Sequence, residues 1–315
     1  MIIYLGGMDT KEGCEALYRA KTPHVLSSFF YARKVAGAMR NLWLATLRQA
    51  SLRFADSGAF TMRTFALADV GSRGSKDVAN VDFDKFLHEY VEWVRALSTA
   101  GLVDYWVELD IGVITGGKWV HAQREKFHRA GLAHGLVNVW HSREHDWEYW
   151  LDLLRESRRH GRSRYVAIEG HQRWRDKLEY SKYLTAAYRR GVRVHGFRLT
   201  AIPDLHGAPW FSVDSTTWTV TGRYGALMST SPAGGIVQHS ARRTRGNAGE
   251  VGTSNPLAFK APVPARMNAT ERRGVLLASA RAWIDAEAHL ADLWRARGVD
   301  WSRAVESPEE ADVGA

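Results

Sequence analysis

The sequence predicts an α/β fold, a single-domain TIM (β/α)8 barrel over residues 1–300 with residues 301–315 as a tail. Short segments rich in β-forming residues alternate with amphipathic stretches in which apolar residues recur every three or four positions. Such alternation indicates βαβ units and a parallel sheet, and eight units close into a barrel. Neither an internal repeat of fixed period nor a linker divides the chain.

The expected strands consist mainly of aliphatic and aromatic residues and are bounded by polar or glycine-containing turns. In chain order they are 2–5, 25–29, 53–56, 105–110, 136–140, 165–169, 194–199 and 210–214. The helices expected between them carry apolar side chains on one face. They are 34–50, 83–99, 122–130, 147–160 and 177–190, followed by a last helix at 270–297.

Residues 228–268 interrupt this alternation. The segment is rich in Gly, Ser, Pro and Arg and includes Arg242, Arg243 and Arg245. A loop of this length in a compact domain is usually functional or disordered, and its place after the last strand puts it on the rim where barrels carry their chemistry. We therefore expect a basic loop inserted after the last strand.

The chain is basic, with a formal net charge of +9 and a pI near 9.7. The excess comes mainly from arginine, which binds phosphate through two hydrogen bonds, so nucleic acid is the leading candidate partner. A solvated basic surface is the alternative interpretation. Cys14 is the one cysteine, which excludes a disulfide or a multi-cysteine metal site within one chain.

The apolar runs fall far short of the roughly 20 residues that a membrane span needs. The first residues also lack the charged start of a signal peptide. We therefore expect a cytoplasmic protein without a membrane partner.

Two aspartates, Asp56 and Asp214, stand in unusual contexts. Each follows a short run of β-forming residues and precedes small, loop-forming residues. Each carboxylate is therefore expected at the carboxyl end of a strand, the edge where barrel enzymes act. Two carboxylates on one rim suggest chemistry at a glycosidic bond. The alternative is a turn residue and a helix N-cap.

The motif Asp56-Ser57-Gly58-Ala59-Phe60 resembles the Asp-Ser-Gly-Gly-Phe/Tyr element of tRNA-guanine transglycosylases. The resemblance extends in order and approximate spacing from about residue 54 to 224, although only this motif is close letter for letter. The other matching segments are Leu109-Asp110, the strand 137–140 with His141, Ile168-Glu169-Gly170, 195–199, 210–214 and Gly222-Arg223.

The chain also departs from that family. Members that act on tRNA carry a zinc subdomain of three cysteines and a histidine after the nucleophile, whereas residues 228–268 contain no cysteine. His141 stands where the family has glutamine. The sequence is most similar to the zinc-free DNA-guanine transglycosylases of phages and bacteria, which place 7-deazaguanines into DNA. This resemblance implies that the protein needs no metal. It also implies a cytoplasmic location, which would be the cytoplasm of the host cell if a phage encodes the protein.

The chemistry implied by the resemblance fits the residues. Exchanging a base with retained configuration needs two displacements at C1′, so one carboxylate attacks while another moves protons. The resemblance assigns Asp214 as nucleophile, Asp56 as general acid/base and Asp110 as acceptor for guanine N–H groups. The other expected base contacts are Ser57, Gly58, Phe60, His141 and Gly170. This mechanism needs no cofactor; the free 7-deazaguanine base is the second substrate.

A base inside a duplex cannot reach two carboxylates in a barrel mouth, so the target nucleotide must be flipped out or single-stranded. The basic side chains expected to bind its phosphates are Arg198, Arg223, Arg242, Arg243 and Arg245. Nothing in the sequence resembles a motor, which leaves room for a helper protein that opens the duplex.

Four alternatives stay open at this stage. The same aspartates could serve a tRNA enzyme, with RNA as the partner, or a glycosidase in which water is the acceptor. A barrel that only binds nucleic acid would also explain the charge. Residues 141–145 match the H-x-x-E-H pattern of a zinc peptidase, but that pattern needs one continuous helix, and the helix here is expected to start near Asp146.

Overall fold

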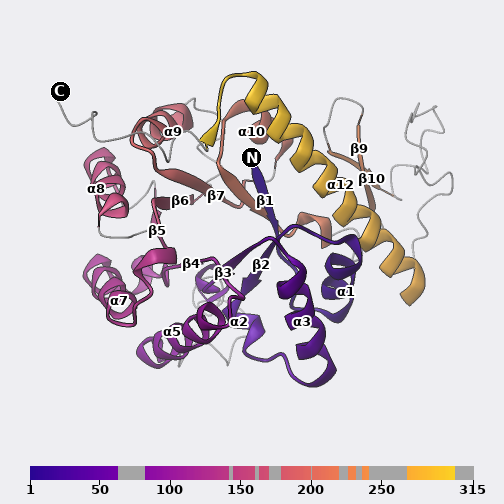
Figure 1. The fold of residues 1–315 in the computed structure, drawn as a ribbon, viewed down its shortest axis with the longest axis horizontal. Coiled ribbons are helices and arrows are strands. Elements are labelled where there is room, and N and C mark those ends of the chain that lie inside the picture. The colour runs from indigo at the N-terminus through magenta and orange to yellow at the C-terminus, as the bar shows by residue number, and fades with distance from the viewer. Residues whose placement is uncertain are drawn as a thin grey trace, which may run out of the picture.

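The computed structural model describes residues 1–62, 82–141, 145–159, 163–169, 179–199, 201–219, 226–231, 236–240 and 268–301. Eight parallel strands form a closed barrel in which each strand pairs with the next and β8 returns to β1 (Figure 1). The strands are β1 (Ile2–Leu5), β2 (His24–Ser28), β3 (Leu52–Asp56), β4 (Tyr105–Val107), β5 (Leu136–Trp140), β6 (Tyr165–Glu169), β7 (Arg193–Phe197) and β8 (Ser212–Ser215). The predicted TIM barrel is confirmed.

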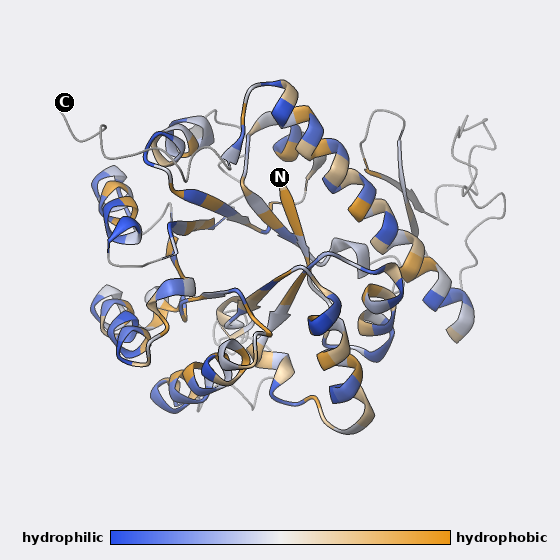
Figure 2. Cartoon of the chain, viewed as in Figure 1, coloured by the Kyte–Doolittle hydropathy of each residue, from blue (hydrophilic) through white to orange (hydrophobic). Residues whose placement is uncertain are grey.

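The helices surround this barrel (Figure 1). They are α1 (Lys11–Ala20), α2 (Phe29–Ala32), α3 (Gly37–Gln49), α5 (Phe83–Thr99), α6 (Gly112–Thr115), α7 (Gly117–Arg129), α8 (Trp147–Arg158), α9 (Glu179–Arg189), α10 (Ile202–Gly207) and α12 (Ala269–Ala296), with 3-10 turns η1 (Ala133–Gly135) and η3 (Thr217–Thr219). Figure 2 shows hydrophobic and hydrophilic residues together on these helices, as expected where only one face is buried.

A capping residue explains why helix α5 is the helix that was predicted best. Helix α5 spans the predicted residues 83–99, and the Asp82 side chain caps it by accepting from the Lys85 N–H. Helix α1 was not predicted, because it buries only a short set of small and apolar side chains. The short helices α2, α6 and α10 were not predicted either.

Two strand boundaries differ from the prediction for identifiable reasons. β4 ends at Val107 rather than at residue 110, because the Gln123 side chain binds both backbone groups of Leu109 and takes them out of the sheet. β8 begins at Ser212 rather than 210, because the Trp210 N–H donates to the Ala208 carbonyl within a turn.

The prediction of a basic loop over residues 228–268 is wrong for the first residues of that segment. Strands β9 (Ala226–Thr230) and β10 (Ile236–Ser240) form an antiparallel hairpin there. The hairpin packs against α12, where the indole N–H of Trp283 donates to the Met228 sulfur at 3.3 Å. Residues 241–267 lie outside the described part of the chain.

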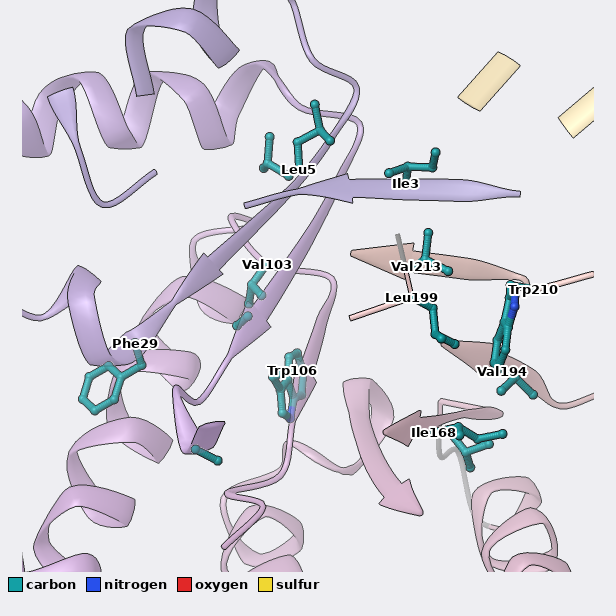
Figure 3. Packing of buried hydrophobic residues seen from close by; sticks show 14 of the residues in the cluster. Ile3, Leu5, Phe29, Val103, Trp106, Ile168, Val194, Leu199, Trp210 and Val213 are labelled. Atoms are coloured by element: carbon teal, nitrogen blue, oxygen red, sulfur yellow. The ribbon is translucent and has the colours of Figure 1, made fainter. Parts of the chain in front are cut away.

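Buried side chains form two layers. The cluster inside the barrel consists of Tyr4, Leu26, Phe54, Val107, Val137, Val139, Tyr165 and Ala167. A larger cluster lies between the strands and the helices, and Figure 3 shows Ile3 of β1 beside its register partner Val213 of β8 within it. Within the described ranges, no helix is both long and apolar enough to cross a bilayer.

A buried ion pair joins the barrel to α7. Arg124 and Glu108 are 2% and 1% exposed, and two guanidinium N–H groups donate to the carboxylate at 2.6 and 3.0 Å. Glu108 also accepts from the Val139 N–H at 2.7 Å. Removing the cation would leave a buried carboxylate without compensation.

We therefore expect Arg124→Met to lower the free energy of unfolding by about 3–5 kcal/mol. Urea denaturation followed by circular dichroism measures this loss. Combining Arg124→Met with Glu108→Gln should recover part of it, because the uncompensated charge is then gone. Equal losses in the single and double variants would contradict this account.

Candidate active site

A cavity of about 390 Å³ opens at the carboxyl ends of the barrel strands. Of the side chains predicted from the sequence, those that line it are Asp56, Ser57, Phe60, Asp110, Arg198 and Asp214. The strands therefore bring the three predicted aspartates to one cavity. Gly170, Arg223, Arg242, Arg243 and Arg245 lie outside the described residues.

Asp56 ends β3, and a tight turn follows it. Its Oδ2 accepts from the Gly58 N–H at 3.1 Å. Gly58 has φ +86°, and a Cβ there would lie 2.3 Å from the Phe30 Cβ, so only glycine fits the turn. Gly58, expected to contact the base, does not line the cavity and instead holds the carboxylate.

Burial raises the pKa of Asp56 to about 6, and the nearby carboxylates of Asp214 and Asp110 add to the increase. The Ser28 hydroxyl and the Gly58 N–H partly oppose it by hydrogen bonding to the carboxylate. A carboxyl group with this pKa exchanges protons near neutral pH, which suits a general acid/base.

Asp214 lies in β8, in register with Tyr4 of β1. Its Oδ1 accepts from the Arg198 N–H at 2.9 Å, and His195 Nε2 lies 3.5 Å from the same oxygen. Arg198 has φ +59°, a conformation uncommon outside glycine. Neither contact engages Oδ2, so the carboxylate is held through one oxygen while the other is left for reaction.

A polar chain inside the barrel orients His195. The imidazole is fully buried, and its Nδ1 lies 2.7 Å from the Ser212 hydroxyl, which in turn hydrogen bonds with the Tyr165 hydroxyl. Burial raises the pKa of Tyr165 far above its ordinary value, so the phenol keeps its proton. Donation from Tyr165 to Ser212 and from Ser212 to Nδ1 puts the imidazole hydrogen on Nε2, toward Asp214.

His141, which follows β5, lies between two carboxylates and does not line the cavity. Its Nε2 is 2.5 Å from Asp110 Oδ1 and its Nδ1 is 2.6 Å from Glu169 Oε2. Burial alone would lower the pKa of His141, but Asp110 and Glu169 outweigh it and raise the value to about 10. The ring is therefore an imidazolium at neutral pH and contacts one oxygen of each carboxylate.

Glu169 is the site residue that the sequence interpretation missed. It ends β6 and lines the cavity beside Asp110. The signal was present in Ile168-Glu169-Gly170, a carboxylate at the end of a predicted strand, but only the glycine was assigned a role.

Helix α7 fixes the backbone that carries Asp110. Gln123 accepts from the Leu109 N–H at 2.8 Å and donates to the Leu109 carbonyl at 2.6 Å. Both groups of this contact are buried, so the residue before Asp110 is held rigidly although it belongs to no strand.

Phe60 and Arg198 meet at the mouth of the cavity. The Arg198 guanidinium lies 4.1 Å from the centre of the Phe60 ring, a cation–π contact. Phe60 is 47% exposed, so both side chains face the opening rather than the core.

The H-x-x-E-H pattern does not form the helical site of a zinc peptidase. His141 and His145 precede α8, which begins at Trp147 with Asp146 as its N-cap, as predicted. Burial and then the positive His141 lower the pKa of His145 to about 4, and its Nδ1 accepts from the His141 N–H at 3.0 Å. In the described ranges no three His, Cys, Asp or Glu side chains are grouped so as to hold a metal ion.

No protein-family model matches the chain, and no curated protein matches it significantly. The residues and the geometry of the site therefore carry the functional assignment.

The raised pKa of His141 predicts a pH dependence of stability. A pKa near 10 in the folded chain, against about 6.5 unfolded, stabilises the fold fully below pH 6.5, and this contribution is lost as pH rises toward 10. We expect the stability difference between wild type and His141→Gln to shrink over that interval. Urea denaturation at pH 6, 8 and 10 measures it. A constant difference would contradict a protonated ring.

Proposed function

We propose that this protein is a base-exchanging transglycosylase, which replaces guanine in nucleic acid by a 7-deazaguanine through a covalent aspartyl–sugar intermediate. The observation that carries the proposal is the convergence of Asp56, Asp110 and Asp214 on one cavity, with Asp56 close enough to the other two carboxylates for their charges to raise its pKa.

In the first displacement, Asp214 attacks C1′ of the target nucleotide and the bond to guanine breaks. The electron pair of that bond leaves with guanine, whose imidazole ring takes the proton of Asp56. In the second displacement, the 7-deazaguanine nitrogen attacks C1′, the ester bond to Asp214 breaks, and Asp56 accepts the N–H proton of the entering base. Both enzyme groups return to their starting states, so no cofactor is consumed.

The cavity offers acceptors suited to a guanine-like ring. His141 contacts one oxygen of Asp110 and one of Glu169, and both carboxylates line the cavity, where Asp110 can accept from N–H groups of the base. Guanine and 7-deazaguanine present neighbouring N1–H and amino donors, which a carboxylate can accept together. Phe60 at the opening supplies an aromatic face for the ring.

DNA is the proposed polymer and RNA the alternative. The preference is supported by the net charge of +9, which favours a polyanion, and by the absence of the cysteines that a tRNA-type zinc subdomain needs. The proposal includes a flipped or single-stranded target, because the carboxylates lie inside a barrel mouth.

The test is to incubate the purified protein with guanine-containing DNA or, in parallel, tRNA, together with free 7-cyano-7-deazaguanine, and to analyse digested nucleosides by mass spectrometry. Modified deoxynucleoside supports the proposal. Modified ribonucleoside would support the same mechanism with RNA, rather than DNA, as the polymer. Abasic sites formed with or without the free base would indicate a hydrolytic glycosidase, and no change in either polymer would favour a binding protein.

A further inference from the structure

Exposed aromatic side chains gather at the mouth of the cavity. In the described part of the chain, the large hydrophobic residues that remain exposed are Tyr18, Tyr31, Phe60 and Ile114. Two of them, Tyr31 at 39% and Phe60 at 47% exposed, line the cavity. An aromatic face left in water beside a cavity is suited to stacking on a planar ligand.

The segment that carries Tyr31 belongs to a stretch without acidic residues. Residues 16–55 contain seven Lys or Arg residues and no Asp or Glu. Arg19 and Arg53 of this stretch are paired with Glu15 and Asp104. Arg33, Lys34 and Arg40 are exposed. We refer to Tyr31, Arg33, Lys34 and Arg40 as the α2 rim.

The topology places the α2 rim at the active end of the barrel. β2 ends at Ser28, and α2 follows directly, so this connection lies at the carboxyl edge of the strands. Tyr31 lines the cavity, and so does Trp43 of α3. Arg40 lies three residues before Trp43 and therefore on the same side of α3.

Aromatic contacts hold two of these cations in place. The Arg33 guanidinium lies 5.3 Å from the ring centre of Phe30 and 4.9 Å from that of Phe86. The Lys34 amine lies 5.4 Å from the ring centre of Phe30. Arg33 is also 4.0 Å from the Glu89 carboxylate, a distance that offsets little of its charge near water.

The cavity itself has the opposite charge. Its carboxyl groups belong to Asp9, Asp56, Asp110, Glu169 and Asp214, whereas Arg198 is the cation that lines it within the described residues. A phosphate backbone is therefore repelled from the floor of the cavity and attracted to the cations outside it. This contrast lets a neutral base enter while its strand stays on the rim.

We propose that the α2 rim binds the single-stranded nucleotides that flank the base in the cavity, with Tyr31 stacking on a neighbouring base and Arg33, Lys34 and Arg40 contacting phosphates. This inference rests on the proposed function for the identity of the ligand. It adds a strand-binding surface to the arginines predicted from the sequence, none of which lies in α2 or α3.

The aromatic part of the proposal is tested by fluorescence anisotropy with a labelled 12-nucleotide single strand. Tyr31→Ala should weaken binding about tenfold, the usual scale for losing one stacked base, while Tyr31→Trp should retain it. The matched control is Tyr18→Ala, because Tyr18 is 40% exposed on α1 and does not line the cavity. Equal affinities of the Tyr31→Ala and Tyr18→Ala variants would overturn the stacking role.

The cationic part is tested by the salt dependence of the same binding. Lys34→Gln and Arg40→Gln should each reduce the slope of log affinity against log salt concentration by about 0.7, the value for one phosphate contact on a single strand. Arg48→Gln is the matched control, since Arg48 is exposed at the far end of the same helix, α3. Unchanged slopes in the Lys34 and Arg40 variants, or equal losses in the control, would overturn the phosphate contacts.

The α2 rim and the proposed function can fail separately. If strand binding depends on Tyr31, Lys34 and Arg40 but no base exchange or covalent adduct is found, the α2 rim stands and the transglycosylase proposal falls. If exchange proceeds and these variants match their controls in strand affinity, the α2 rim falls and the enzyme proposal stands. Melting temperatures of the variants equal to that of wild type ensure that neither result reflects unfolding.

Discussion

Replacing Asp214 by asparagine should slow base exchange by at least about 10⁴-fold and abolish the covalent enzyme–sugar adduct. The amide keeps the shape of the side chain, and its oxygen can still accept from the Arg198 N–H that now holds Oδ1 at 2.9 Å. What is lost is the anionic oxygen that attacks C1′. The structure leaves Oδ2 out of both contacts that fix this carboxylate, which is the arrangement a nucleophile needs.

The adduct is observed directly by denaturing electrophoresis of protein mixed with guanine-containing strands, before the second base is added. Wild type should yield a species of higher mass that disappears when 7-deazaguanine is supplied. The control is Asp152→Asn, the same chemical change on the exposed outer helix α8, which should react like wild type. An adduct that persists in Asp214→Asn would show that another residue attacks the sugar.

The sequence predicted the parts of the site that local patterns encode. Asp56 and Asp214 each sit where β-forming residues give way to small ones, and this pattern alone places a carboxylate at the carboxyl end of a strand. In a closed parallel barrel all such ends meet on one rim, so correct strand order was enough to predict that the two aspartates share a cavity.

The contacts between strand ends could not be predicted in this way. His141 was expected to touch the base, yet it lies between Asp110 and Glu169, residues 31 and 28 positions away in the chain. Whether the His141 side chain meets these two carboxylates depends on how β4, β5 and β6 pair and on where each strand ends. The prediction for β4 overran by three residues, because the Gln123 side chain that ends it comes from α7, later in the chain.

The hairpin of β9 and β10 shows the same limitation at the level of the fold. Composition rich in Gly, Ser, Pro and Arg predicted a loop from residue 228, but Met228 is buried and packs against Trp283 of α12. Strand pairing is stabilised by side-chain packing on a partner, and here that partner is a helix more than fifty residues later in the chain.

Asp56→Asn should slow formation of the covalent adduct by about 10²–10⁴-fold, the range expected when a general acid is removed. In wild type the group must be protonated to deliver a proton to the departing guanine. Because its pKa is about 6, the rate of adduct formation should be highest below pH 6 and fall about tenfold per pH unit above it. Asp56→Asn should lose this decline, because its amide has no proton to titrate.

A strand that contains 7-methylguanine separates this role from a structural one. Its base carries a positive charge on the imidazole ring and departs without receiving a proton. Asp56→Asn should therefore form the adduct from this strand at close to the wild-type rate, while Asp214→Asn should remain inactive on it, since an attacking carboxylate is needed in both cases. If Asp56→Asn were equally impaired on both strands, its carboxyl group would be required for positioning or for the fold rather than as the acid, and Asp214 alone would remain assigned as a reacting group.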